Sequence, residues 1–159
     1  MGRKSRQKAK QSRAPRRDTG GGTRRDPAAA SRETTLLGAG LIGLAVSALL
    51  DAEYATPGSG LCSVVGGGCD AVRMSGWSSV AGISLPTLGI VFFLGLLATT
   101  LVPALRAALL PLALFGGFAG VVFIALQGLV IGAWCPLCLV VDFAADGAAT
   151  RAWTIRRTP

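Results

Sequence analysis

Charge and apolar residues are segregated along this chain, and this segregation restricts the fold more than any other feature. Of the 16 lysines and arginines, eleven lie in residues 1–33 and three in residues 151–157. Arg73 and Arg106 lie between them. A soluble domain distributes such residues over its whole surface, because they are rarely buried. Basic ends around a largely uncharged interior are instead typical of a membrane protein.

Residues 1–33 are rich in Lys, Arg, Gly and Ser and contain few apolar side chains. Such a segment cannot bury enough surface to offset the entropy of ordering, so we expect a disordered tail. One interpretation is an arm that binds nucleic acid or anionic lipid. The other is a cytoplasmic tail that obeys the positive-inside rule beside a first membrane helix. We favour the second and expect no nucleic-acid partner.

Two apolar segments open the part of the chain that we expect to fold. The first span is Leu36–Leu50, which is shorter than the roughly 20 residues that a bilayer usually requires. A cleaved secretory signal is therefore a rival interpretation, although the long basic leader and the later spans argue against it. The second span is Ile83–Val102, with Pro86 near its start.

Two further spans follow. The third is Ala107–Ile131, which Pro103 separates from the second. The fourth begins at Leu139 and is the weakest, because Asp142 and Asp146 interrupt it. Four apolar helices with short connections predict an all-α, integral membrane four-helix bundle.

The basic residues also predict how the bundle is oriented. With residues 1–33 inside, residues 51–82 form a long external loop between the first two helices, and Arg106 marks an inner turn. Both termini are then cytoplasmic, and every basic cluster lies on the same side. We expect a membrane domain at residues 34–155 and a short cytoplasmic tail at residues 156–159.

This topology brings the four cysteines to the outer face, where disulfides can form and persist. Cys62 and Cys69 lie in the external loop, and Cys135 and Cys138 lie where the third span meets the fourth. Three pairings of four cysteines are possible, so the sequence leaves their connectivity open.

Three interpretations of the cysteines compete: a zinc site, two structural bridges, or a redox relay. The six-residue gap in the first pair is wide for zinc ligands, and the chain has no histidine. A bridge across the two-residue gap of Cys135 and Cys138 closes a very small loop and stabilises little. At a helix start, however, the N-terminus stabilises a thiolate, most directly that of Cys138. A thiolate at the membrane edge can meet both an aqueous thiol and a lipid-soluble electron acceptor.

Three motifs carry a resemblance to a known family: LCSVVGGGCDAVRMSGW, GISLPTLG and WCPLC. Together with four apolar spans, they resemble the vitamin K epoxide reductase family in its bacterial single-domain form, from about Leu36 to Trp153. The resemblance implies a four-helix bundle that holds a quinone, ubiquinone or menaquinone, near the outer surface. It also implies no metal.

The resemblance assigns roles to individual residues. Cys138 is expected to exchange electrons with the quinone, and Cys135 with the loop, through Cys69. Cys62 would take electrons from a separate thioredoxin-fold partner of the DsbA type. Ser75, six residues after Cys69, matches a family serine near the active centre, and its hydroxyl is a potential hydrogen-bond donor to a thiolate or a quinone oxygen. A turn or capping serine is the alternative interpretation.

Two positions depart from the pattern of vertebrate members. Asp142 stands where they have a tyrosine that contacts the quinone, and Leu85 stands where they have an asparagine. These differences weaken the expectation of epoxide reduction but not of quinone reduction. Asp142 either bonds the quinone or relays protons to it, or it faces the bundle paired with another group such as Gln127. Trp77 and Trp134 are candidates for the pocket wall.

The function most consistent with these residues is that of a quinone-dependent thiol oxidoreductase in the cytoplasmic membrane of a bacterium. It would support disulfide formation by passing electrons from the partner through both cysteine pairs to quinone. One alternative is a quinone or quinone-epoxide reductase that serves quinone recycling. Another is a membrane scaffold, not an enzyme, with two structural disulfides.

Overall fold

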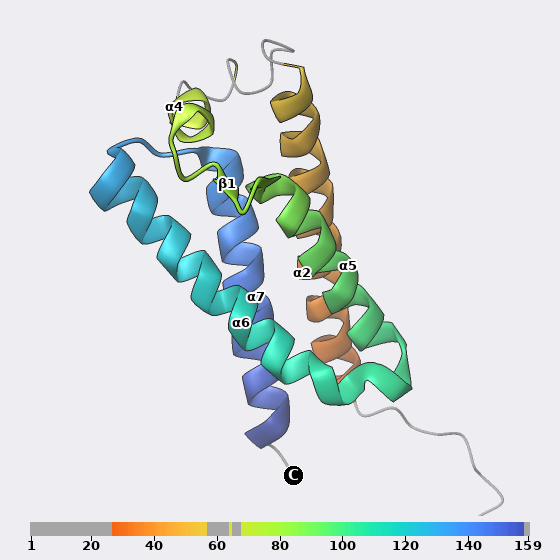
Figure 1. The fold of residues 1–159 in the computed structure, drawn as a ribbon. Helices are drawn as coiled ribbons and strands as arrows, with labels where there is room; N and C mark the ends of the chain where they lie inside the picture. The colour runs from red at the N-terminus through yellow and green to blue at the C-terminus, as the bar shows by residue number, and fades with distance from the viewer. Residues whose placement is uncertain (1–26, 57–63, 65–67, 158–159) are drawn as a thin grey trace, which may run out of the picture.

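The structure, a computed structural model, describes residues 27–56, residue 64 and residues 68–157. In this part of the chain four long helices run side by side, as Figure 1 shows. They are α2 (Pro27–Ala55), α5 (Leu85–Leu101), α6 (Arg106–Leu126) and α7 (Pro136–Arg157). The start of α2 and the end of α7 lie at one end of the bundle, and the connection from α6 to α7 lies at the other.

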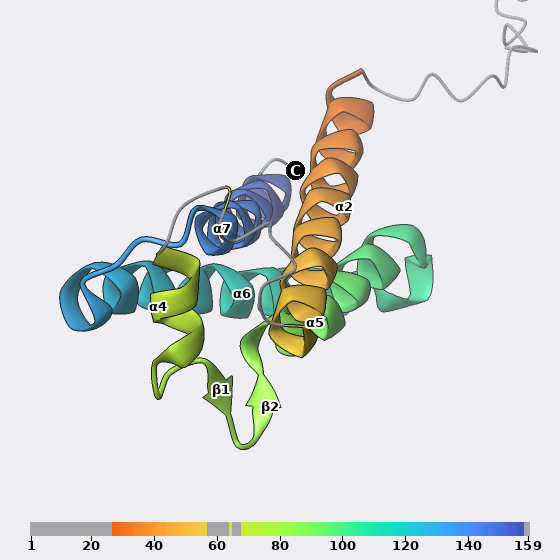
Figure 2. The ribbon, with the colours of Figure 1, turned by 90° about the horizontal axis from the view of Figure 1, so that it is seen from above.

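Short elements cover that second end. Helix α4 (Gly68–Met74) is followed by an antiparallel hairpin of β1 (Ser79–Val80) and β2 (Ile83–Ser84), which projects beside α5 in Figure 2. The two hairpin turn residues, Ala81 and Gly82, both have positive φ angles, 52° and 83°. A two-residue turn with this geometry matches the twist of the strands that it joins.

The four long helices form a closed ring of contacts, because α2 packs against α5 and α7, and α6 packs against the same two helices. The core between them includes Leu36, Phe93 and Leu96. Small residues bring α6 and α7 close together: a Cβ added to Gly117 would lie 2.6 Å from the Cβ of Ala149. Close approach through small residues is a common way for helices to associate in membranes.

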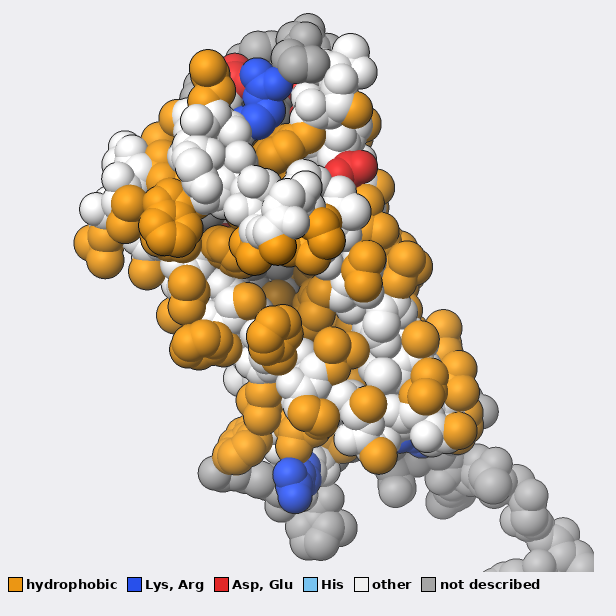
Figure 3. All heavy atoms as spheres, in the orientation of Figure 1, with side chains coloured by type: hydrophobic (Ala, Val, Ile, Leu, Met, Phe, Trp, Pro, Cys, Tyr) orange, Lys and Arg blue, Asp and Glu red, His pale blue; other side chains and the backbone are white. Residues whose placement is uncertain are grey.

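The helical class predicted from the sequence is confirmed. Among the described helices, two segments are long and apolar enough to cross a membrane: Glu33–Ala55 and Pro103–Ile131. Leu85–Leu101 is apolar but shorter. In Figure 3, hydrophobic side chains cover the flank of the bundle, and charged side chains lie near its two ends. The four-span topology and its orientation in the membrane stay predictions.

Several element boundaries differ from the expected ones. Helix α2 begins at Pro27, inside the segment expected to be a disordered tail, because proline suits the first helical turn and three alanines follow. The rest of that tail lies outside the described residues. The predicted second span starts with strand β2, and α7 starts at Pro136, three residues before the expected Leu139.

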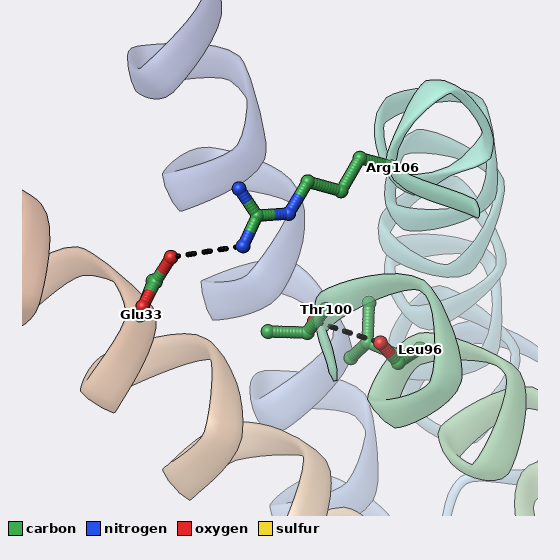
Figure 4. Close-up of polar contacts among 4 residues, drawn as sticks. All are labelled: Glu33, Leu96, Thr100 and Arg106. Atoms are coloured by element: carbon green, nitrogen blue, oxygen red, sulfur yellow. Dashed lines mark hydrogen bonds and ion pairs between the residues drawn. The ribbon is translucent and has the colours of Figure 1, made fainter. Parts of the chain in front are cut away.

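An ion pair joins two helix starts at the end of the bundle opposite α4. The Arg106 guanidinium at the start of α6 lies 3.3 Å from the Glu33 carboxylate on α2, as Figure 4 shows. A 3₁₀ turn, η2 (Pro103–Leu105), precedes Arg106 and turns the chain from α5 into α6. The predicted turn at Arg106 therefore lies at the same end of the bundle as the end of α7.

Candidate active site

Cys135 directly precedes α7 and Cys138 lies in its first turn, as their position before an apolar helix predicted. The Cys135 carbonyl accepts a hydrogen bond from the Leu139 N–H at 3.0 Å, which is the first bond of the helix. The Cys135 sulfur accepts one from the Cys138 N–H at 3.3 Å, so Cys135 caps the helix with its side chain. Both sulfurs therefore lie at the positive end of the helix dipole.

The chain reaches Cys135 through a widened turn at the end of α6. A π-helical turn, η3 (Gln127–Ile131), ends at Gly132, which has a left-handed φ of 68° that glycine adopts without strain. The N–H groups of Gly132 and Ala133 both donate to the Gln127 carbonyl. This turn leads the backbone back over Gln127, whose side-chain oxygen accepts the Cys135 N–H at 2.9 Å.

The structure brings Cys69 of the loop to Cys135. The Cys135 thiol donates to the Cys69 sulfur across a distance of 2.9 Å, and the two side chains are 1% and 3% exposed, respectively. They belong to an apolar cluster with Leu50 and Val72. Cys62, the other loop cysteine, lies outside the described residues.

Gly68 permits Cys69 to lie this close to Cys135. A Cβ at Gly68 would overlap the carbonyl oxygen of Trp134 and would lie 2.7 Å from the carbonyl carbon. Since Gly68 precedes Cys69 and Trp134 precedes Cys135, the two backbones touch one residue before each sulfur. The absence of a side chain at Gly68 thus lets α4 pack against the start of α7.

The two cysteines of the motif have different surroundings. A hydrogen bond with the Cys138 side chain, together with burial, raises the pKa of the Cys135 thiol far above its ordinary range. Cys135 therefore keeps its proton at neutral pH. Cys138 is only partly buried and lines a cavity, so of the two sulfurs it is the one open to a small molecule.

The cavity has a volume of about 640 Å³ and lies between the four long helices. Most of its wall is apolar, and its size is typical of pockets for drug-sized ligands. A few polar side chains interrupt this wall: Ser47, Tyr54, Gln127 and Asp142. The fit to a quinone is good, because an apolar chamber with a few hydrogen-bonding groups beside a thiol suits an apolar ring with two oxygens.

Asp142 combines two features that the sequence had presented as alternatives. It lines the cavity one helical turn after Cys138. It is also 6% exposed and paired, since the Gln127 amide nitrogen donates to its Oδ2 at 3.3 Å. Asp146, one turn further on, does not belong to the cavity wall.

The three remaining candidates lie in different surroundings. Trp77 lines the cavity and is 54% exposed. The ring of Trp134 instead lies on Gly128, where an added Cβ would be 2.8 Å from it, and is not part of the cavity wall. The Ser75 hydroxyl donates to the Val72 carbonyl at 2.6 Å and accepts the Trp77 N–H at 3.4 Å, which is the geometry of a turn serine.

Ser47 is a site residue that the sequence did not single out. Its side chain is fully buried in the cavity wall, and its hydroxyl has no hydrogen-bond partner among the described residues. Gly89 leaves room for it, because a Cβ there would lie 2.6 Å from the hydroxyl oxygen. A serine within an otherwise apolar span was the available signal.

The apolar helices, and the cysteine thiols that they set beside an apolar cavity, are features of a membrane-associated helical protein with a candidate thiol site. The sequence profile of the vitamin K epoxide reductase family matches residues 34–145, and the chain belongs to this family. The family is one of membrane oxidoreductases that use thiols and quinone-type substrates, so the protein is a membrane redox enzyme. Neither the curated proteins nor the solved structures gave a match.

Proposed function

We propose that this enzyme oxidises the thiols of a separate thioredoxin-fold protein and delivers the electrons to a membrane quinone. The protein would act in the inner membrane of a bacterium with its cysteines on the outer side. The observation that carries the proposal is the continuity of the sulfurs. Cys69 lies 2.9 Å from Cys135, and Cys138 of the same helical turn lines the cavity.

The first half of the reaction is thiol–disulfide exchange. The partner's dithiol reduces the Cys62–Cys69 disulfide and becomes a disulfide itself. The Cys69 thiolate then attacks Cys135 in the Cys135–Cys138 disulfide, which releases Cys138. Attack of Cys62 on Cys69 restores the loop disulfide and releases Cys135, which takes up a proton because its pKa is raised. Two electrons move from the loop to the helix pair.

The second half takes place at the cavity. A bound quinone accepts two electrons and two protons and leaves as a quinol. On the protein side, Cys135 and Cys138 lose two electrons and two protons and form their disulfide again. Cys138 presents its sulfur to the cavity, and Asp142 holds a carboxyl group at the same wall, where it can hold or pass a proton.

Two wall positions favour quinone over its epoxide as the substrate. Leu85 and Asp142 both line the cavity, at the positions where vertebrate members have an asparagine and a tyrosine. At these two positions the cavity wall therefore has neither the asparagine nor the tyrosine of the vertebrate members. These are the two differences that weakened the expectation of epoxide reduction.

The test uses purified protein, a reduced thioredoxin-fold protein and a ubiquinone or menaquinone analogue, with quinone absorbance as the readout. Wild type should form quinol, and Cys135→Ala and Cys138→Ala should not. Cys62→Ala should lose oxidation of the protein partner but still reduce quinone with a small dithiol. A wild-type protein that forms no quinol with either analogue would refute the proposal and favour a scaffold.

A further inference from the structure

Gln127 is a buried amide that belongs to none of the cysteine motifs. It is 3% exposed, and it lies at the end of an otherwise apolar helix. An amide in such surroundings is costly unless its hydrogen-bonding groups are satisfied. Both polar atoms of the Gln127 side chain, and its backbone carbonyl, are used at the active site.

The amide oxygen of the Gln127 side chain holds the backbone of the redox motif. Its Oε1 accepts the Cys135 N–H at 2.9 Å, and its own carbonyl accepts the N–H groups of Gly132 and Ala133. The π-helical turn makes this possible, because it returns the chain over the residue at which the turn begins. Turns of this kind are frequent at functional sites.

The amide nitrogen of the same side chain holds the Asp142 carboxyl group at the cavity. Its Nε2 donates to the Asp142 Oδ2 at 3.3 Å, and both residues line the cavity wall. One Asp142 oxygen is thereby held toward Gln127. A single side chain thus connects the nucleophilic turn with the acidic group.

We propose that Gln127 is a positioning residue that sets Cys135 and Asp142 together, and this inference rests on the proposed quinone reduction. Cys135 must exchange bonding partners between Cys69 and Cys138 without displacement of its backbone. Asp142 must keep its carboxyl group at the cavity in both redox states. Gln127 meets both demands, since its two contacts are to the Cys135 backbone and to Asp142, not to a sulfur.

The experiment is a double-mutant cycle of Gln127→Met and Asp142→Asn, in purified full-length protein. Methionine keeps the length of the side chain but removes both hydrogen bonds. Each single variant should lower kcat for quinone about tenfold to a hundredfold, and the double variant should be little worse than Gln127→Met alone. Additive losses would mean that Gln127 does not act through Asp142, and would overturn that half of the proposal.

A second readout needs no quinone. The rate at which Cys69 forms its mixed disulfide with Cys135 is followed by acid quenching and thiol alkylation. Gln127→Met should slow this exchange, whereas Asp142→Asn should leave it at the wild-type rate, because Asp142 does not hold Cys135. An unchanged rate in Gln127→Met overturns the positioning of Cys135.

Two further variants keep the result interpretable. Thr100→Val removes a buried hydroxyl that bonds the Leu96 carbonyl of its own helix, far along α5 (Figure 4), and should change neither readout. If Gln127→Met does not fold, Gln127→Glu replaces it. Glutamate keeps the oxygen that accepts the Cys135 N–H but loses the amide that donates to Asp142, so exchange should persist while kcat falls.

The cycle also separates this inference from the function on which it rests. Wild type that forms no quinol, with exchange slowed in Gln127→Met, refutes the quinone reaction and keeps the role of Gln127 at Cys135. Wild type that forms quinol, with both readouts unchanged in Gln127→Met, refutes the positioning role alone.

Discussion

Gly68→Ala tests whether the close approach of α4 to the start of α7 is what joins the two cysteine pairs. The added methyl group would overlap the Trp134 carbonyl oxygen and would lie 2.7 Å from its carbon, whereas ordinary contact begins at 3.4 Å. Both of these atoms belong to the backbone, so neither can rotate away. The two segments must separate by at least about 0.7 Å at the carbonyl carbon.

This displacement falls on the residues next to the reacting sulfurs. A misplacement of about 1 Å can slow a reaction on the order of a hundredfold when geometry limits the rate. We therefore expect Gly68→Ala to slow electron transfer from Cys69 to Cys135 by about this factor. Quinone reduction driven by a small dithiol acting directly on Cys135 and Cys138 should change little, because neither Gly68 nor Trp134 lines the cavity.

The assay compares two electron donors with one variant. Quinone absorbance is followed with the reduced protein partner and, separately, with a membrane-permeant dithiol. Gly76→Ala is the matched control: it adds the same methyl group to the same loop, where nothing lies within 4 Å of it. Equal rates of Gly68→Ala and Gly76→Ala with the protein partner would refute the argument, as would an equal loss with both donors.

The remaining predictions concern stability, protonation and topology. Ser47→Ala should raise the free energy of unfolding of quinone-free protein by about 1 kcal/mol, because a buried hydroxyl without a described partner is removed; a decrease in a detergent unfolding titration would contradict this. Reduced Cys135 should be alkylated slowly at about pH 8 and faster as pH rises further, since its raised pKa keeps the thiolate scarce. Peptide mass spectrometry measures this, and a rate independent of pH would contradict it. Ser79→Cys, in a variant without native cysteines, should react with an impermeant maleimide on intact cells, because the hairpin is expected outside; labelling only after lysis would reverse the topology. Arg106→Ala should lower stability by less than about 1 kcal/mol, since its pair with Glu33 is exposed, and a larger loss in the same titration would show that the pair is shielded.

Local patterns explain what the sequence predicted well. The helix start just after Cys135 follows from a proline at the next position and an apolar helix behind it. The position of Asp142 on the same face as Cys138 follows from the helical repeat alone. Both inferences use only residues that are close together in the sequence, and neither depends on how the helices pack.

Features that depend on packing between distant segments were not predictable. The contact of Gly68 with Trp134 joins residues far apart in the chain, and glycines are too common in this sequence for one of them to attract notice. Ser47 likewise became a candidate through packing, since the structure buries it in the cavity wall without a described hydrogen-bond partner. Trp134 was a candidate for the pocket wall, but its ring lies against Gly128 and does not line the cavity.

The spacing of the motif is itself part of the mechanism that we propose. As the capping residue, Cys135 precedes the helix and lies under α4, in the buried cluster that contains Cys69. Cys138 is in the first turn, where its side chain reaches the cavity. Two intervening residues place Cys135 in the buried cluster beside Cys69 and Cys138 at the cavity, so in the proposed mechanism electrons from the loop reach the cavity through the bond that the pair itself makes and breaks.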